Sequence, residues 1–400
     1  MASRTDQEYQ NLKKRVHYYL VERLDEEGVE VGRVSNDVLA TFVQNNVAGY
    51  VSHHRTPLSA QDLTNLTREI QDEVAGFGPL EPLLADESVN DILVNGPEDV
   101  FVEVAGVLQR ANTRFIDDDH VVRIIRRILA PLGRRLDESS PMVDARLPDG
   151  SRVNAIIPPI ALDGPSISIR KFTQKHLTAQ DLVDRGSMSA DCLELLTKLV
   201  QNRRNILVSG GTGTGKTTIL NMLSQYIPRE ERVVTIEDSA ELQLNHPHIV
   251  RLETRPANTE GSGKVTARDL VINSLRMRPD RIILGEVRSG EIIELLQAMN
   301  TGHEGSMSTI HANTARDALV RIETLLAVNG YDASERAVGR LIGSSLDVIV
   351  QLSRLANGRR LVSEVVALAG DGDDPYRMES LYRTNTDEAG EPIPTLGSAL

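Results

Sequence analysis

Apolar residues near the amino terminus recur at steps of three and four residues, which is the spacing of one face of an α-helix. One such stripe contains Tyr9, Leu12, Val16, Tyr19, Leu20 and Leu24. A second helix is predicted from Ser35 to His54, and Pro57 and Ser59 begin a third. Three amphipathic helices bury their stripes against one another or against a partner. We therefore predict a helical domain over residues 1–75, and leave open whether its apolar faces form a core or a docking module.

The pattern changes after residue 75, where the glycines and proline of Gly76-Phe77-Gly78-Pro79 mark a boundary. Strands are predicted over residues 91–94, 100–104 and 166–172, and on both sides of a turn at Pro148-Asp149-Gly150. A helix is predicted over residues 118–129. This mixture predicts a small α/β domain over residues 76–172.

From residue 173 onward, helical periodicity alternates with short apolar runs, which favours a largely parallel sheet covered by helices. Strands are predicted over residues 206–209, 233–237, 250–254, 281–285 and 306–310, and a hairpin over 347–352 and 361–368. From residue 371 the chain holds seven acidic and two basic side chains among scattered glycines and prolines. We therefore predict one large domain over residues 173–385 and a flexible tail over residues 386–400.

The most specific motif follows the first of these strands. Residues 210–218 read GGTGTGKTT, which satisfies the phosphate-loop pattern of Gly, four residues and Gly-Lys-Ser/Thr. Glycines let backbone N–H groups approach a phosphate chain that a Cβ would hold away, and the dipole of the following helix adds favourable potential. Nucleotide contacts are predicted at Gly210, Gly211, Thr212, Gly213, Thr214, Gly215, Lys216, Thr217 and Thr218. In this interpretation Lys216 reaches the β- and γ-phosphates, and the Thr217 hydroxyl is a ligand of Mg²⁺.

Carboxylates follow two of the other predicted strands. Glu286 ends the strand over residues 281–285, where it binds Mg²⁺ or orients the attacking water. Glu237, Asp238 and Glu241 form a second cluster, and neighbouring carboxylates repel one another unless a cation neutralises them. We therefore predict that Glu237 and Asp238 contribute to the nucleotide site. Glu241 is the preferred water-activating residue and Glu237 is the reserve, although the sequence alone leaves this choice open.

Two histidines, His303 and His311, flank the strand predicted over residues 306–310. A metal site would need two more ligands, and the region lacks both a cysteine and the HExxH spacing, so no metal is expected there. His311 follows the strand, which places it at the same sheet edge as the phosphate loop. That position suits a residue that senses the γ-phosphate better than a catalytic acid.

Composition narrows the remaining classes of protein. The chain has 400 residues, a formal net charge of −13, 3% aromatic residues and no tryptophan. This balance argues against a chain-wide nucleic-acid surface and against base stacking, so no direct nucleic-acid partner is expected. Cys192 is the single cysteine, which excludes an intramolecular disulfide. No run approaches the roughly 18 apolar residues of a membrane span, so we expect a cytoplasmic protein that associates with a membrane only peripherally.

Taken in order, four motifs resemble those of the type II/IV secretion, or traffic, ATPase superfamily. They are the phosphate loop, Ile-Glu-Asp-x-x-Glu at 236–241, Ile-Leu-Gly-Glu-Val-Arg at 283–288, and Gly-His-Glu-Gly-x-x-x-Thr-x-His-Ala-Asn at 302–313. Upstream, Gly-Phe-Gly-Pro-Leu-Glu-Pro-Leu-Leu, Ile-Leu-Val-Asn-Gly and Arg-Leu-Pro-Asp-Gly-Ser-Arg-Val-Asn resemble segments of the tight-adherence (Tad/Cpa, Flp-type) pilus assembly ATPases. The resemblance covers roughly residues 76–370 and does not include the acidic tail.

This resemblance implies a fold and an assembly. The fold would be a RecA-like P-loop NTPase domain, preceded by a smaller PAS-like α/β domain and the amino-terminal helical bundle. The assembly would be a homohexamer with ATP bound between the two α/β domains. We expect it to dock on a polytopic platform protein of the inner membrane.

The resemblance also implies residue roles. Lys216 and Thr217 would bind ATP and Mg²⁺, Glu286 would be the acid of the second motif, and Glu241 would activate water. The residues of the histidine box would be His303 and His311, and arginines of the PAS-like domain that reach the nucleotide would be Arg152 and Arg170. Arg288, which ends the second motif, is left open between a nucleotide contact and an intersubunit salt bridge.

We therefore expect Mg²⁺-dependent ATP hydrolysis by an oligomeric motor that powers Tad/Flp-type pilus assembly or protein secretion. A DNA translocase or helicase built on the same core is the first alternative, and a type IV secretion or conjugation ATPase is another. A nucleotide-dependent scaffold without turnover also remains.

Overall fold

The computed structural model describes residues 4–29, 34–104, 106–147, 149–172, 177–255, 262–355, 357–370, 374, 376–386 and 392–397. The chain divides into two compact units, an amino-terminal unit of residues 1–174 and a carboxy-terminal unit of residues 175–400. Among the described residues, no helix has the length and apolar character needed to cross a membrane.

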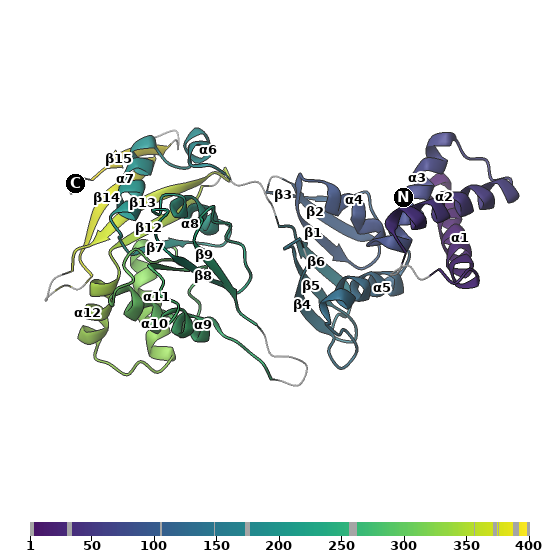
Figure 1. The fold of residues 1–400 in the computed structure, drawn as a ribbon. Coiled ribbons are helices and arrows are strands. Elements are labelled where there is room, and N and C mark those ends of the chain that lie inside the picture. Colours follow the sequence, from purple (N-terminus) through teal and green to yellow (C-terminus); the bar gives the residue numbers. More distant parts are fainter. Residues whose placement is uncertain are drawn as a thin grey trace. The chain divides into compact units, whose positions relative to one another are not determined.

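The amino-terminal unit begins with a bundle of three helices (Figure 1). They are α1 (Arg4–Glu26), α2 (Asn36–His53) and α3 (Ala60–Ala75). Their apolar stripes pack against one another, and Leu20, Val43 and Leu66 are completely buried. The Ser59 hydroxyl accepts a hydrogen bond from the backbone N–H of Asp62 and so caps α3. The three predicted helices are confirmed, and their stripes form a core of their own.

The rest of this unit is a six-stranded antiparallel sheet in the order β3-β2-β1-β6-β5-β4. Its elements are η1 (Gly78–Leu80), α4 (Glu81–Ala85), β1 (Val89–Asn95), β2 (Asp99–Val104), β3 (Val107–Arg110), α5 (Asp118–Leu129), η2 (Ala130–Leu132), β4 (Met142–Arg146), β5 (Arg152–Ile156) and β6 (Ser166–Arg170). Helix α5 confirms the predicted helix and packs its apolar side on one face of the sheet, against buried residues such as Val153 and Ile169.

The carboxy-terminal unit contains a nine-stranded sheet in the order β15-β14-β13-β12-β7-β11-β10-β8-β9. Strands β12 to β9 in that order are parallel, and β13 to β15 are antiparallel. The strands are β7 (Ile206–Gly210), β8 (Val233–Glu237), β9 (Ile249–Glu253), β10 (Arg281–Leu284), β11 (Met307–Ile310), β12 (Val348–Arg354), β13 (Arg360–Leu368), β14 (Met378–Thr386) and β15 (Pro392–Leu396). The largely parallel sheet and the predicted strand pair, here β12 and β13, are confirmed.

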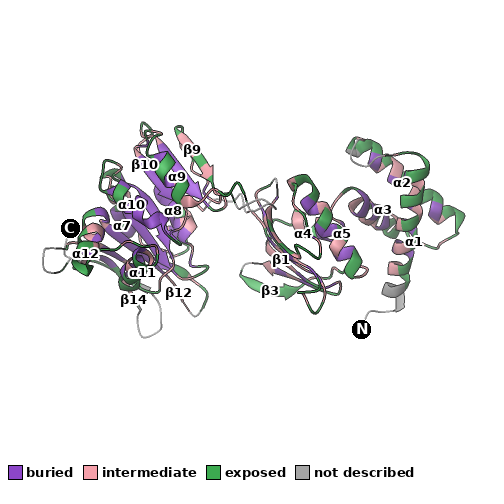
Figure 2. Cartoon of the chain, turned by 90° about the horizontal axis from the view of Figure 1, so that it is seen from below, coloured by how far each residue is buried: buried purple, intermediate pink, exposed green. Residues whose placement is uncertain are grey.

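Helices cover both faces of this sheet (Figures 1 and 2). They are α6 (Ala179–Asp184), α7 (Ala190–Gln201), α8 (Lys216–Ser224), α9 (Ala267–Ser274), α10 (Glu291–Met299), α11 (Ala315–Val328) and α12 (Glu335–Ser345). One core contains side chains of α7 and α8, and the other contains side chains of α9 to α12. Every residue of β7, β8, β10 and β11 is buried, as expected for parallel strands covered by helices on both faces.

The flexible tail predicted for residues 386–400 is wrong for its described part. β15 pairs antiparallel with β14 and extends the sheet by one edge strand. Pro392 and Pro394 are compatible with this strand because an edge strand leaves one row of backbone N–H groups unpaired. Residues 387–391 and 398–400 lie outside the described residues.

Candidate active site

The phosphate loop connects the end of β7 to the start of α8. Gly213 and Gly215 have φ values of 70° and 96°, in the region that favours glycine, and Gly215 caps α8. A Cβ on Gly210 would lie 2.5 Å from the Thr214 hydroxyl and 3.1 Å from Cβ of Leu352, so this position also requires glycine. The loop therefore has the geometry that brings backbone N–H groups close to a phosphate.

The Lys216 side chain folds back onto this loop. Its ammonium donates hydrogen bonds to the carbonyl oxygens of Gly210 and Gly211, both at 3.0 Å, and lies 3.1 Å from Nδ1 of His311. The residue is only 8% exposed, and burial lowers the pKa of its ammonium. Lys216 is thus held at the loop by acceptors that a phosphate oxygen can replace.

The remaining loop residues close the turn or begin α8, and their contact with a nucleotide stays a prediction. The Thr214 hydroxyl donates to the Gly211 carbonyl oxygen at 2.9 Å and so closes the loop. Thr217 and Thr218 follow Lys216 in the first turn of α8, and Thr212 is exposed.

Strand order brings the predicted acids and one histidine to the same edge of the sheet. The order β7-β11-β10-β8 is parallel throughout. The phosphate loop, His311 and Glu286 therefore follow the carboxyl ends of adjacent strands, and Glu237 is the last residue of β8. Neighbouring strands lie about 4.8 Å apart. Residues separated by almost a hundred positions therefore meet in one row.

His311 joins Lys216 to Glu286. Its Nε2 lies 2.9 Å from Oε1 of Glu286, while its Nδ1 faces the Lys216 ammonium. Burial, followed by the charge of Lys216, lowers the pKa of His311. The imidazole is therefore neutral, accepts a hydrogen bond from Lys216 at Nδ1 and donates one to Glu286 at Nε2.

Arg288 holds Glu286 from the other side. Its Nε and a terminal nitrogen donate to Oε2 of Glu286 at 2.9 and 2.6 Å, and its second terminal nitrogen lies 3.1 Å from Oδ2 of Asp238. The hydrogen bond with Glu286 raises the pKa of Arg288. The sequence left Arg288 open between nucleotide and neighbouring subunit, and the structure shows a third arrangement, in which it bridges two acids of its own chain.

Glu237 fixes the backbone of the segment that carries Glu241. Its Oε2 accepts hydrogen bonds from the backbone N–H groups of Glu241 and Leu242, both at 2.8 Å. Its side chain also packs on Gly285, because a Cβ there would lie 3.0 Å from Cγ of Glu237. Burial raises the pKa of Glu237 to about 7. The geometry favours a positioning role for Glu237, whereas Glu241 is only half-buried.

The donor set at this edge fits a magnesium ion. Thr217 offers a hydroxyl oxygen and Glu286 a carboxylate, and Mg²⁺ prefers hard oxygen ligands completed by phosphate and water oxygens. Within the described ranges, no group of three or more His, Cys, Asp and Glu side chains is arranged to hold a metal by itself. These residues therefore fit an ion that arrives with a nucleotide.

His303 is not brought to this edge. Its carbonyl oxygen accepts a hydrogen bond from the Ser306 hydroxyl at 2.7 Å, ahead of β11. The whole of β11 thus separates His303 from His311, and His303 lies at the amino-terminal end of the strand. Its role in the site stays a prediction.

The predicted arginines of the amino-terminal unit form a row with a third arginine. Arg152 lies directly opposite Arg170 on β6 and opposite Arg146 on β4. Directly paired residues share a face, and this face is opposite the core because the next residues along, Val153 and Ile169, are buried. Sequence reasoning missed Arg146, although Arg146 and Arg152 stand symmetrically about the turn at 148–150. Their predicted contact with a nucleotide stays a prediction.

Comparison with known proteins adds three findings. A family profile described as "Type II/IV secretion system protein" matches residues 73–387. A putative conjugal transfer protein of Mycobacterium tuberculosis (strain ATCC 25618 / H37Rv) is 40% identical over 312 residues, which cover 76% of this chain and 88% of that protein. The conjugal transfer protein TrbB of Rhizobium radiobacter is 33% identical over 333 residues, which cover 80% of this chain and 96% of that protein.

Solved structures are similar in fold. The pilus retraction motor PilT with bound ADP aligns with a TM-score of 0.54 at 22% identity, covering 72% of this chain and 80% of that one. The ATPase DotB of Legionella pneumophila aligns with a TM-score of 0.51 at 20% identity, covering 73% and 83%. These likenesses confirm the predicted RecA-like P-loop fold.

Proposed function

Because the chain belongs to the type II/IV secretion system protein family, we propose that it is an ATPase whose hydrolysis of ATP powers a secretion machine or a pilus. The observation that carries this proposal is the row from the phosphate loop through Lys216 and His311 to Glu286. A phosphate loop alone binds nucleotide, whereas a row of acids beside it supplies groups for activating water.

Binding begins with the phosphate chain on the loop. Backbone N–H groups at the start of α8 and the Lys216 ammonium hold the β- and γ-phosphates. Lys216 then exchanges its contacts with loop carbonyl oxygens for phosphate oxygens. Thr217 and Glu286 would hold a Mg²⁺ ion, which would supply positive charge against those oxygens.

Glu241 takes a proton from the attacking water, and Glu237 fixes its position through the backbone N–H of Glu241. His311 is placed to register the γ-phosphate because it already contacts Lys216. Arg152 and Arg170 stabilise the charge that develops on the transferred phosphoryl group. Arg288 holds Glu286 in place through two hydrogen bonds to its Oε2.

The motor works as a homohexamer in the cytoplasm, docked peripherally on a polytopic inner-membrane protein. ATP drives movement only if it binds one domain arrangement better than ADP does, so that the γ-phosphate biases a two-state equilibrium. For this reason we assign Arg152 and Arg170, which belong to the amino-terminal unit, to the γ-phosphate of the nucleotide.

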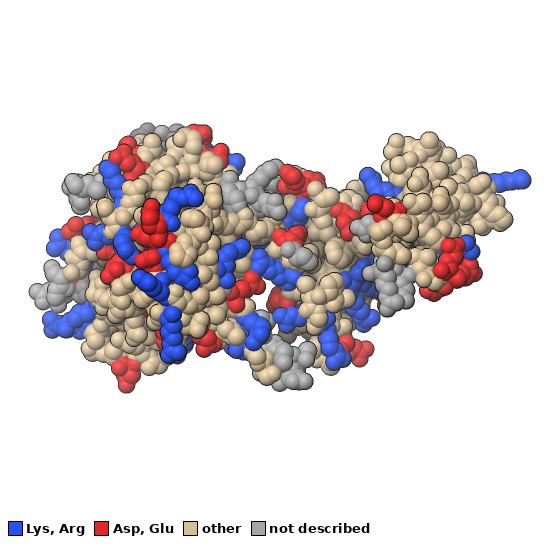
Figure 3. Space-filling model, viewed as in Figure 1, with Lys and Arg blue, Asp and Glu red and all other residues tan. Residues whose placement is uncertain are grey.

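Two machines are candidates for this motor. The segments upstream of the phosphate loop favour assembly of a Tad/Flp-type pilus. The names of the 40% and 33% identical relatives favour a conjugal, type IV secretion machine. A DNA translocase has less support, because the face in Figure 3 shows acidic and basic side chains interspersed over the carboxy-terminal unit.

Steady phosphate release from ATP tests the proposed activity. We expect the wild type to turn over and Lys216→Ala to lose both nucleotide affinity and turnover, while Lys198→Ala, which removes an exposed lysine of α7, leaves both unchanged. Absence of turnover in the wild type would leave a nucleotide-dependent scaffold. Deletion of the gene in its host then separates the machines: loss of surface pili indicates the pilus motor, and loss of plasmid transfer indicates the conjugal one.

A further inference from the structure

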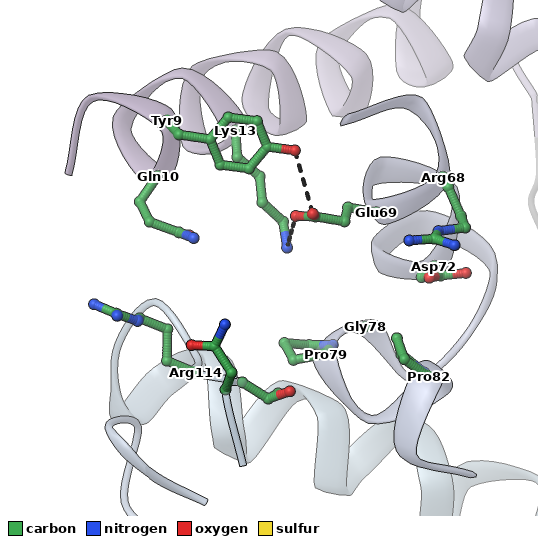
Figure 4. A pocket seen from close by; sticks show the side chains of 12 residues that line it. Tyr9, Gln10, Lys13, Arg68, Glu69, Asp72, Gly78, Pro79, Pro82 and Arg114 are labelled. Carbon is green, nitrogen blue, oxygen red and sulfur yellow. Dashed lines mark hydrogen bonds and ion pairs between the residues drawn. The ribbon is translucent and has the colours of Figure 1, made fainter. Parts of the chain in front are cut away.

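A hollow of about 350 Å³ lies in the amino-terminal unit (Figure 4). Four segments line it: α1, α3, the stretch from η1 to α4, and the loop that follows β3. Its lining residues include Tyr9, Gln10, Lys13, Arg68, Glu69, Asp72, Pro79, Pro82 and Arg114. Its volume is at the lower end of the range of small-molecule pockets, and the residues assigned to the nucleotide take no part in it.

Lys13 supplies a buried cation at this hollow. Lys13 is 8% exposed, and its ammonium lies 3.0 Å from Oε2 of Glu69 and 3.5 Å from Oε1 of Glu73. An ammonium has three N–H donors, so one remains for another acceptor. Figure 4 shows the ammonium pointing into the hollow.

Two guanidinium groups flank the same space. Figure 4 shows Arg68 and Arg114 on opposite sides of it. Neither forms an ion pair with another described side chain. The charge of Arg68 acts on Asp72, which lies beside it in Figure 4. A planar guanidinium matches a carboxylate or a phosphate group through two parallel N–H donors.

Glu69, an acid of the lining, already has two partners within the chain. Glu69 accepts a hydrogen bond from the Tyr9 hydroxyl at 3.2 Å in addition to its pair with Lys13. Burial raises the pKa of Asp72. The Tyr9 ring and the rings of Pro79 and Pro82 add apolar wall. The lining thus holds three cations, Lys13, Arg68 and Arg114, and two acids, Glu69 and Asp72.

We propose that this hollow binds a small molecule through a phosphate or carboxylate group, held by Arg114, Arg68 and the Lys13 ammonium. The volume suits a compact anion or the charged end of a metabolite. Lys13 is also bonded to Glu73, whose Oε2 lies 2.8 Å from Nε2 of His120 on α5. The ligand would thus sit on the joint between the helical bundle and the sheet.

The test uses the full chain carrying Lys216→Ala, which removes the main cation of the phosphate loop. Titration calorimetry with inorganic pyrophosphate and, separately, with citrate measures binding of each anion. We expect one-to-one binding of at least one probe and a loss of about tenfold in affinity with Arg114→Ala, the effect of a charged hydrogen bond. The matched control is Arg110→Ala, which removes an exposed arginine paired with Asp99 outside the hollow.

The two probes separate the sources of the anionic group. Binding of pyrophosphate alone identifies a phosphate-bearing ligand, and binding of citrate alone identifies a carboxylate. The proposal is overturned if neither probe binds, or if Arg110→Ala weakens binding as much as Arg114→Ala. It is also overturned if affinity survives the double change Arg68→Ala with Arg114→Ala, in which both altered side chains are exposed.

Discussion

At the edge of the sheet, the side chains that bind ATP can be distinguished by mutation from those needed for its hydrolysis. Glu241 gives the clearest test. We expect Glu241→Gln to keep its ATP affinity and to lose turnover by roughly a hundredfold or more, because an amide binds in the same place but takes no proton. Equilibrium binding of ATP and steady phosphate release measure the two effects. Normal turnover in Glu241→Gln would move the water-activating role to Glu237 or Glu286.

Glu237 predicts a pH dependence that is independent of catalysis. Its pKa rises from an ordinary 4.5 to about 7 because the carboxyl is buried. Between these values the unfolded chain loses a proton that the folded chain keeps, so stability falls as pH rises from about 4.5 to about 7. The whole effect is about 3 kcal/mol. Urea unfolding at pH 5 and pH 7.5 measures the free energy of unfolding. We expect it to fall between these pH values in the wild type and to fall less in Glu237→Gln. Equal falls in the two proteins would contradict the prediction.

The residues of this site were predictable to different degrees. The phosphate loop, Glu286 and His311 each follow a buried strand, so motif and strand period together place them at one edge. Arg288 was not predictable, because its partner Asp238 is fifty positions away and only strand order makes them neighbours. For Glu237, the sequence shows an acid in a cluster, but only the backbone path shows which N–H groups it accepts.

At the scale of elements, a buried charged group joins the helical bundle to the sheet. Glu73 on α3 is 3% exposed and lies between Lys13 on α1 and His120 on α5. Burial opposes ionisation, but the hydrogen bond from His120 and the charge of Lys13 outweigh it and lower the pKa of Glu73. The backbone N–H of Ile116 donates to Nδ1 of His120, and the ring donates to Glu73 through Nε2.

Removing this charge should loosen the three helices together. We expect Glu73→Gln to destabilise the amino-terminal unit by about 3–5 kcal/mol, because Lys13 and His120 would lose a buried partner. Amide hydrogen exchange in α1 and α3 measures the loss. Glu69→Gln is the matched control, since Glu69 also pairs with Lys13 but is partly exposed, and we expect about 1 kcal/mol or less there. Equal effects of the two changes would show that burial of Glu73 is unimportant.

The elements themselves show what a sequence pattern can and cannot settle. Long periodic segments such as α1 and α5 were predictable because their apolar stripes are wide. β15 was missed because prolines and acids were taken as breakers, whereas an edge strand tolerates both. The pairing that places it there depends on β14, whose Tyr382 is buried in the core.

At the scale of the whole molecule, three arginines lie in one row across β4, β5 and β6. Arg146, Arg152 and Arg170 occupy directly paired positions of adjacent strands, where like charges destabilise a sheet. Asp91 lies opposite Arg170 on β1. The proposed function assigns two of them, Arg152 and Arg170, to a phosphate group of the nucleotide.

This row therefore predicts how the chain distinguishes ATP from ADP. We expect Arg152→Ala and Arg170→Ala each to weaken ATP by about tenfold and to leave ADP nearly unchanged, because only ATP carries the phosphate that a guanidinium outside the loop would contact. Arg110→Ala, on β3 of the same sheet, is the control. Equilibrium binding of both nucleotides to the full chain measures the ratio. Equal losses for ATP and ADP would show that the arginines are structural residues and do not contact the γ-phosphate. Hydrolysis would then have no contact through which to drive movement of the amino-terminal unit.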